Sequence, residues 1–302
     1  MKISVITWDA DFRENTHSID YFCQQDFPEG DFEFIWVDSF DSNNLVREKI
    51  AKYPHARLLP LQNLQDTPWH IGKCINTGVM SSSGKVLVIC DGDIVVERDF
   101  LSYVWQSHQN YEDLILYFRR YDELKNDRVN QGFPSISYLQ QKTQLMNPTN
   151  YGGCLSLRRK NFEIIRGYET HSVFSGPGCQ GLETYTRLLN AGMAIKWAQG
   201  KKIYHPWHAN SGLPGHADSK SLQLAHLDYP WIIPYAGIKQ SWIVHCRKLS
   251  EDFIADAVAC EKYLKEMPVI DFDFYKKLSP VLKIVGRNRF TGSVIKLFNK
   301  VR

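Results

Sequence analysis

The chain has no run of 18 apolar residues, the length that a membrane-spanning helix needs. The apolar run at its N-terminus, MKISVITW, is much shorter than the hydrophobic region of a secretory signal peptide. Internal repeats and low-complexity segments are also absent. These absences predict a cytoplasmic, globular protein without a segment that crosses a membrane.

The sequence also lacks cysteine pairs at metal-binding or redox spacing. Its seven cysteines are odd in number and include no Cys-x-x-Cys, which argues against a disulfide framework or a zinc site and fits reduced thiols. The net charge of +3 is too small to indicate a nucleic-acid partner. A hydrophobic content of 43% with 23% charged residues is ordinary for an enzyme with a full core.

Short apolar runs alternate with helical patterns through the first hundred residues. Strands separated by helices form parallel sheets, so this alternation predicts an α/β fold with a mostly parallel, doubly wound sheet flanked by helices. Strands are expected over 3–8, 32–38, 56–61, 86–90 and 114–118, and helices over 13–27, 43–53, 71–82, 98–111 and 182–191.

The fourth expected strand, 86–90, ends in Asp91-Gly92-Asp93. Two carboxylates this close repel each other, and a shared divalent cation relieves the repulsion. Hard cations such as Mg²⁺ and Mn²⁺ prefer oxygen ligands and also hold phosphate oxygens. A simple turn is the alternative, since Asp and Gly both favour turns. Because the strands ending at Asp9 and Asp38 reach the same sheet edge, where such sheets bind ligands, we favour the metal–diphosphate interpretation.

Residues 122–150 are polar and show little periodicity. A long irregular segment indicates a substrate-covering loop or a surface excursion without a role. Further on, a short strand within 193–204 leads into Tyr-His-Pro-Trp-His at 204–208.

Five ordered blocks resemble the family 2 glycosyltransferases of the GT-A (Rossmann-like) fold. They cover about residues 1–210 and read ISVIT, IWVDSFDS, GKCINTGVMSSSGKVLVICDGD, YGGCLSLRRKNF, and GLETYTRLLNAG followed by YHPWH. The resemblance implies a nucleotide-sugar donor (a UDP-sugar), a glycan or lipid-linked acceptor, a divalent Mn²⁺ or Mg²⁺ ion, and single displacement with inversion at the anomeric carbon.

The resemblance also assigns residues to the donor site. Asp38 would face the nucleobase, with the loop at Thr7 and Asp9 beside it, and Asp91 would lie near the ribose and diphosphate. In the third helix, Lys73 and Asn76 would approach the diphosphate; alternatively, Lys73 is a solvated charge and Asn76 a buried polar cap.

For the metal, the resemblance makes Asp93 the principal carboxylate ligand. A histidine near the end of the domain would complete its shell, and His205 and His208 stand in the corresponding place. Imidazole suits Mn²⁺ acceptably. The alternative is that both histidines are ordinary polar residues of a loop.

The acceptor hydroxyl must lose a proton, and the family supplies a carboxylate base from an acidic pair before a helix. This chain has Gln180-Gly181 at that place. Glu183 is then the candidate base, or else the partner of Arg187 in a helical i,i+4 ion pair.

Three regions are expected: a nucleotide-sugar-binding half (1–95), an acceptor-binding half of the same domain (96–210), and a mainly helical C-terminal extension (211–302). Residues 274–302 contain eight Lys or Arg and no acid, a pattern of helices that lie on an anionic membrane or of a solvated basic face. Two other functions stay open: a sugar-nucleotide nucleotidyltransferase, and a catalytically impaired member that binds nucleotide or glycan.

Overall fold

The computed structural model describes residues 1–208 except 11–14, 42, 64–67, 126–133, 149, 166, 171–173, 177–179 and 191–192. The chain divides into two compact units, Met1–Ala225 and His226–Arg302, and all described residues belong to the first. The C-terminal extension and its basic segment therefore lie outside the described residues. Among the described helices, none has the length and apolar character needed to cross a membrane.

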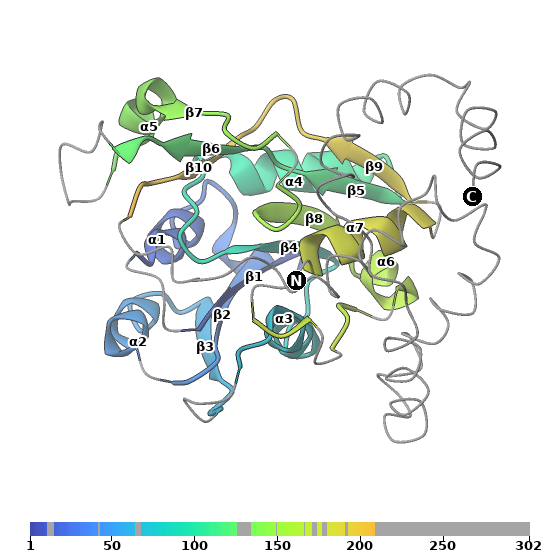
Figure 1. Ribbon diagram of the computed structural model, residues 1–302, viewed down its shortest axis with the longest axis horizontal. Coiled ribbons are helices and arrows are strands. Elements are labelled where there is room, and N and C mark those ends of the chain that lie inside the picture. The colour runs from blue at the N-terminus through green and yellow to red at the C-terminus, as the bar shows by residue number, and fades with distance from the viewer. Residues whose placement is uncertain are drawn as a thin grey trace, which may run out of the picture. The chain divides into compact units, whose positions relative to one another are not determined.

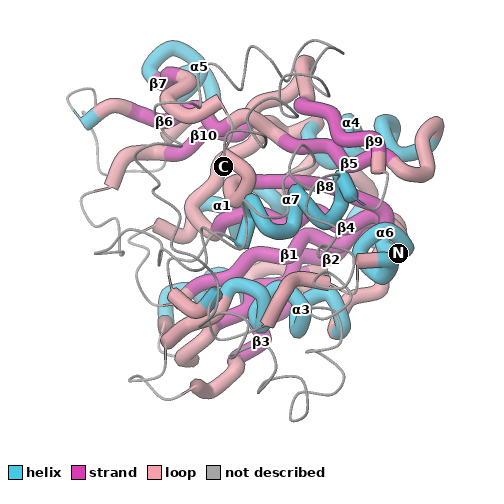
Figure 2. The backbone as a smooth tube through the Cα atoms, turned by 45° about the vertical axis from the view of Figure 1, so that its right-hand side comes forward, coloured by secondary structure: helices cyan, strands magenta, loops and turns pink. Residues whose placement is uncertain are grey.

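The core of the fold is a seven-stranded sheet in the order β3-β2-β1-β4-β8-β5-β9. Figure 2 shows these strands side by side, from β3 at the bottom to β9 at the top. All neighbours are parallel except β8, which is antiparallel to both β4 and β5. The mostly parallel α/β sheet is thus confirmed. The strands are β1 (Ile3–Asp9), β2 (Phe32–Asp38), β3 (Ala56–Pro60), β4 (Val86–Asp91), β5 (Leu114–Tyr117), β8 (Cys154–Arg158) and β9 (Ala194–Trp197).

Helices cover both faces of this sheet (Figure 1). They are α1 (His17–Cys23), α2 (Asn44–Ile50), α3 (Ile71–Met80), α4 (Phe100–Gln109), α6 (Arg159–Ile164) and α7 (Gln180–Asn190), with a 3-10 turn η1 (Glu29–Asp31). The helix expected over 13–27 is shorter in the structure, because α1 spans only His17–Cys23.

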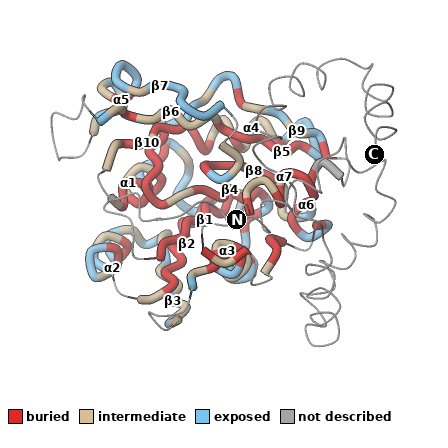
Figure 3. Tube along the Cα trace, in the orientation of Figure 1, coloured by how far each residue is buried: buried red, intermediate tan, exposed pale blue. Residues whose placement is uncertain are grey.

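Alternation along the strands explains the two layers. In β1, Ile3 and Val5 pack with residues of α1, α2 and α4, whereas Ile6 and Trp8 pack with residues of α3, α6 and α7. Successive side chains of a strand point to opposite faces, so each central strand feeds both cores. The central strands are buried along their length (Figure 3).

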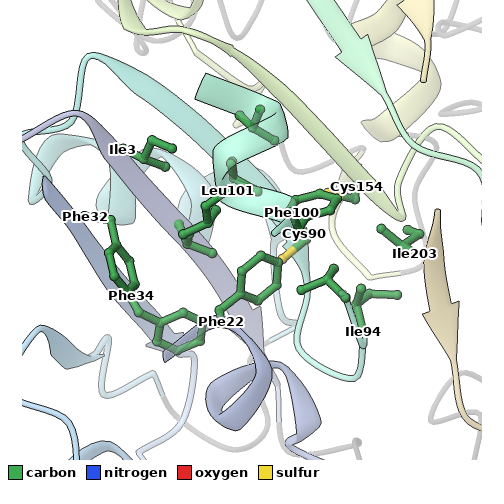
Figure 4. Packing of buried hydrophobic residues seen from close by; sticks show 14 of the residues in the cluster. Ile3, Phe22, Phe32, Phe34, Cys90, Ile94, Phe100, Leu101, Cys154 and Ile203 are labelled. Carbon is green, nitrogen blue, oxygen red and sulfur yellow. The ribbon is translucent and has the colours of Figure 1, made fainter. Parts of the chain in front are cut away.

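The first of these cores is rich in phenylalanine (Figure 4). Phe22 of α1 stacks on Phe34 of β2 with ring centroids 6.2 Å apart, and meets Phe100 of α4 edge-on at 5.8 Å. These contacts fix α1 and α4 on the same side of the sheet.

A second, three-stranded sheet has the order β10-β6-β7. It consists of β6 (Arg120–Glu123), β7 (Thr143–Gln144) and β10 (Ile203–His205), and α5 (Ile136–Lys142) lies beside it (Figure 1). The expectation that 122–150 lacks regular structure is therefore wrong for its described residues. Polar strands of this kind lack the apolar alternation that marks a strand in sequence.

Candidate active site

Three aspartates lie at the carboxyl edge of the large sheet. Asp9 pairs in register with Asp38, and Trp8 pairs with Asp91 on the other side of β1. The residues that the sequence pattern places at one edge therefore lie at the ends of three adjacent strands. Open α/β sheets bind ligands at this edge.

The Asp38 side chain is almost fully buried and organises the turn after β2. Its Oδ1 accepts hydrogen bonds of 3.0 Å from the backbone N–H groups of Phe40 and Asp41. Its Oδ2 is buried and has no hydrogen-bond partner within the described part of the chain. A buried acceptor without a donor is costly, so this oxygen is suited to a donor supplied by a ligand.

Thr7 lies deeper than the carboxylates. Its side chain is fully buried, and its hydroxyl donates to the Ile35 carbonyl at 3.4 Å. This contact supports the pairing of β1 with β2.

The Asp-Gly-Asp turn is held from two sides. A Cβ atom on Gly92 would come within 2.6 Å of the buried Trp36 ring, so only glycine fits there without displacing the turn. The Gly92 carbonyl accepts hydrogen bonds from the Ser18 hydroxyl at 2.7 Å and the Ser18 N–H at 3.3 Å. The position of Asp93 is thereby fixed relative to α1 and β2.

A short bridge brings the late histidines to this turn. Val95 and Tyr204 form an isolated antiparallel bridge, two residues after Asp93 and one residue before His205. Asp93 Oδ2 lies 3.6 Å from His205 Nε2 and 3.6 Å from His208 Nε2, and the two imidazole nitrogens are 3.2 Å apart.

These three side chains form a cluster that could hold a metal ion. A point about 2 Å from all three donor atoms satisfies their separations, and this is the usual metal–ligand distance for imidazole and carboxylate. Two nitrogens and one carboxylate oxygen suit a transition metal better than Mg²⁺, which prefers oxygen. The residues present thus fit a divalent cation.

The surroundings of His205 raise its pKa. Burial lowers its pKa, but the Asp93 charge and hydrogen bonds to Asp122 and Asp93 outweigh this effect and raise the pKa to about 9. Its Nδ1 lies 3.1 Å from Asp122 Oδ1, on the side of the ring away from Nε2. Asp122 has no sequence motif around it, and only the pairing of β6 with β10 reveals its place.

The two α3 candidates differ in their surroundings. Lys73 is exposed in the first turn of the helix. The Asn76 side chain is committed to the loop after α6, because it donates to the Tyr168 carbonyl and accepts from the Tyr168 N–H, both at 2.9 Å. These contacts are those of the polar cap considered as the alternative for Asn76.

Gln180, where the resembling family has an acid, is fully buried. Its Oε1 accepts from the Gly72 N–H at 2.9 Å, and its Nε2 donates to the Glu169 carbonyl at 2.9 Å. This side chain therefore ties the start of α7 to the start of α3. A Cβ atom on Gly181 would lie 2.8 Å from the Gly152 nitrogen, so the close approach of two backbones leaves no room for a side chain at 181.

Glu183 and Arg187 form a buried ion pair one turn further along α7, each side chain being 3–4% exposed. Arg187 donates from Nε to Glu183 Oε1 and from Nη2 to Oε2, the latter at 2.8 Å. Its Nη1 also donates to the carbonyls of Ile165 and Gly167. The contacts are those of the i,i+4 pair considered for Glu183, and its role as a base stays a prediction.

The charges of this pair also act on the buried Tyr168 phenol. Burial raises the pKa of Tyr168, Arg187 opposes the rise, and the charges of Glu183 and Asp91 add to it. The pKa of Tyr168 is therefore influenced by both Glu183 and Asp91.

Part of the chain matches a known protein family. Residues 16–165 match the family model described as glycosyl transferase family 2. No curated protein matches the sequence at a significant level.

Solved glycosyltransferases share the fold. The structure of S. aureus TarS 1-349 with UDP-GlcNAc is 15% identical with a TM-score of 0.53, over 83% of this chain and 73% of that one. GalNAc-T7 with UDP, GalNAc and Mn²⁺ is 11% identical with a TM-score of 0.56, over 83% and 54%. Mannosyltransferase PcManGT from Pyrobaculum calidifontis, with GDP-Man and Mn²⁺, is 14% identical with a TM-score of 0.51, over 97% and 82%. The expected GT-A fold is confirmed.

Proposed function

We propose that this chain, which carries a glycosyl transferase family 2 domain, is a metal-dependent inverting enzyme that moves a sugar from a nucleotide donor to an acceptor hydroxyl. The observation that carries the proposal is the cluster of Asp93, His205 and His208. It lies at the sheet edge where β2 ends at Asp38 and β4 ends at Asp91. The family match favours glycosyl transfer over the nucleotidyltransferase alternative.

The donor is proposed to lie across the ends of β1, β2 and β4. Asp38 would accept from the nucleobase through its buried Oδ2, with Thr7 and Asp9 beneath that position, and Asp91 would hold the ribose. Lys73, exposed at the start of α3, stays a candidate for the diphosphate. A UDP-sugar is proposed because TarS and GalNAc-T7 carry uridine nucleotides, whereas PcManGT carries a guanosine nucleotide.

Asp93, His205 and His208 would hold the cation, and Mn²⁺ is proposed over Mg²⁺ because two of the three donors are imidazoles. When bound, such a cation acts as a Lewis acid that neutralises charge on the leaving diphosphate. The residues supply the fixed positions: the turn at Gly92 places the carboxylate, and the Val95–Tyr204 bridge places the imidazoles.

The transfer itself is a single displacement. The acceptor oxygen forms a bond to the anomeric carbon from the face opposite the diphosphate, the bond to the diphosphate breaks, and the acceptor proton passes to a carboxylate. Glu183 is the proposed carboxylate. Since Arg187 holds both of its oxygens, Glu183 must exchange part of that contact to receive the proton.

Nucleoside diphosphate release tests the proposal. The purified full chain, given UDP-GlcNAc, UDP-glucose or GDP-mannose with Mn²⁺, is expected to release the diphosphate from a UDP-sugar and to lose this activity with EDTA. Asp93→Ala is expected to lower the rate by about 100-fold or more, since metal charge stabilisation contributes several kcal/mol. Asp113→Ala, at an exposed acid, is the matched control.

Donor binding without turnover would support the impaired-member alternative instead. Release of pyrophosphate from a nucleoside triphosphate and a sugar phosphate would support a nucleotidyltransferase. Thermal shift with UDP and with GDP identifies the nucleobase of the donor, because a ligand that binds only the folded state raises the melting temperature of the protein.

The acceptor is proposed to be a glycan or a lipid-linked sugar at the inner face of a membrane. This rests on the basic composition of residues 274–302, which lie outside the described residues. Co-sedimentation of the full chain with anionic but not neutral vesicles, reversed by salt, is the expected result. Equal sedimentation with both vesicles, or with neither, would contradict this part.

A further inference from the structure

Two consecutive acids at the end of β6 contact the segment that carries both histidines. Asp122 Oδ1 lies 3.1 Å from His205 Nδ1, and Glu123 Oε2 accepts a hydrogen bond from the Trp207 N–H at 2.9 Å. Successive residues of a strand point to opposite sides, so the two acids hold this segment at two separate points.

The Asp122 contact orients the ring of His205. The pairing of β6 with β10 places Asp122 directly opposite His205 in register. In the neutral ring that a cation would bind, Nδ1–H donates to the Asp122 carboxylate and the Nε2 lone pair faces Asp93 and His208. Arg120 Nε lies 2.9 Å from the same Asp122 oxygen and forms an ion pair with it from the same strand.

The Glu123 contact fixes the chain between the two histidines. Glu123 is 6% exposed, and its other oxygen accepts from the Tyr138 hydroxyl of α5 at 2.5 Å. Trp207 lies directly before His208, so a backbone bond at Trp207 limits where the His208 ring can stand. The ring of His208 meets that of His205 edge-on, with centroids 5.1 Å apart.

We infer that Asp122 and Glu123 are positioning residues of the metal centre, Asp122 acting through the His205 ring and Glu123 through the backbone that carries His208. The inference rests on the proposed function, because it concerns the same cation. It adds residues that no sequence pattern identifies, from a segment expected to be irregular.

Mn²⁺ binding to the full chain tests the inference without any substrate. Free Mn²⁺, measured by electron paramagnetic resonance during titration, gives the dissociation constant. Asp122→Asn is expected to raise this constant by about 10-fold or more, the usual effect of losing an outer partner of a metal-bound histidine. Asp113→Asn, the same change at an exposed acid, is expected to stay within about twofold of the wild type.

A double-mutant cycle separates positioning from general damage. In a His205→Gln background, Asp122→Asn is expected to change the dissociation constant by less than about twofold, because the residue through which it acts is gone. An equal loss in both backgrounds would overturn the inference for Asp122. An unchanged Mn²⁺ dissociation constant in the Asp122→Asn single variant would also overturn it.

Glu123 is tested by a conservative rescue. Glu123→Ala is expected to weaken Mn²⁺ binding about 10-fold, while Glu123→Gln, which keeps an acceptor oxygen for the Trp207 N–H, stays near the wild type. Equal effects of the two variants would overturn the assignment. If the wild-type chain binds no Mn²⁺, or Asp93→Ala binds it as well as the wild type, the metal centre of the proposed function fails instead.

Discussion

Val95 and Tyr204 exchange two backbone hydrogen bonds of 2.9 Å, one in each direction, although 108 residues separate them. This pair joins the loop after β4 to strand β10 of the small sheet. The candidate metal cluster depends on it, because Asp93 comes from one side of the pair and the two histidines from the other. Four testable predictions concern this site and the fold around it.

The first concerns the turn that carries Asp93. Gly92→Ala is expected to raise the Mn²⁺ dissociation constant about 10-fold, because the added methyl group would meet the Trp36 ring at 2.6 Å and displace the carboxylate. Gly30→Ala is the matched control, since nothing lies within 4 Å of a Cβ atom there. Mn²⁺ binding that is equal in the two variants would show that the turn tolerates the methyl group.

A second prediction separates the two roles of Glu183. If it receives the acceptor proton, Glu183→Gln lowers kcat per folded molecule about 100-fold, with the donor KM little changed. The variant is also expected to be less stable, because Arg187 is left buried without its carboxylate. Circular dichroism gives the folded fraction for this comparison. A kcat near the wild-type value per folded molecule would assign Glu183 to structure alone.

Replacing Gln180 by an acid is expected to destabilise the protein. In Gln180→Glu, a carboxylate oxygen replaces the amide group that donates to the Glu169 carbonyl, and the position is fully buried. We expect a loss of about 1–3 kcal/mol in the free energy of unfolding, measured with urea. Gln109→Glu, on the exposed side of α4, controls for the change in charge. Unchanged stability together with faster turnover would mean that the site accepts the acid.

The fourth prediction is a pH dependence of stability. His108 is fully buried, its Nε2 lies 2.9 Å from the Ser156 hydroxyl oxygen, and burial, helped by the Arg158 charge, lowers its pKa to about 4. In the unfolded chain His108 takes up a proton near pH 6.5, whereas in the folded chain it does so only near pH 4. The contribution of His108 to the free energy of unfolding is therefore fully present above about pH 6.5. It falls by up to about 3 kcal/mol between pH 6.5 and pH 4, and does not fall further below pH 4.

Urea unfolding of the wild type at pH 7 and pH 4.5 measures this loss. His108→Gln, which has no titrating group, is expected to be less stable at pH 7 but to lose less between the two pH values. If both proteins lose the same unfolding free energy between pH 7 and pH 4.5, the pH dependence belongs to groups other than His108.

The parallel sheet and its acidic edge could be predicted because their information is local. Apolar runs mark the strands at 3–8, 32–38 and 86–90, and a glycine between two acids marks the turn. The two histidines could be proposed only through the family resemblance.

The small sheet could not be predicted in the same way. Strand β6 reads Arg-Tyr-Asp-Glu and pairs with residues 203–205, far along the chain, so its structure comes from tertiary contacts and not from a hydrophobic pattern. The same holds for Gln180, whose amide is explained only by the backbone groups of Gly72 and Glu169.

The bridge at Tyr204 also sets an order of events during synthesis. When the ribosome has made the first 200 residues, the ends of β1, β2 and β4 are already present, but neither imidazole has been added. The proposed cation site is therefore completed only after the sheet edge that carries Asp38 and Asp91 has been synthesised. A polypeptide that ends at residue 200 would contain that edge and Asp93, but neither histidine of the cluster.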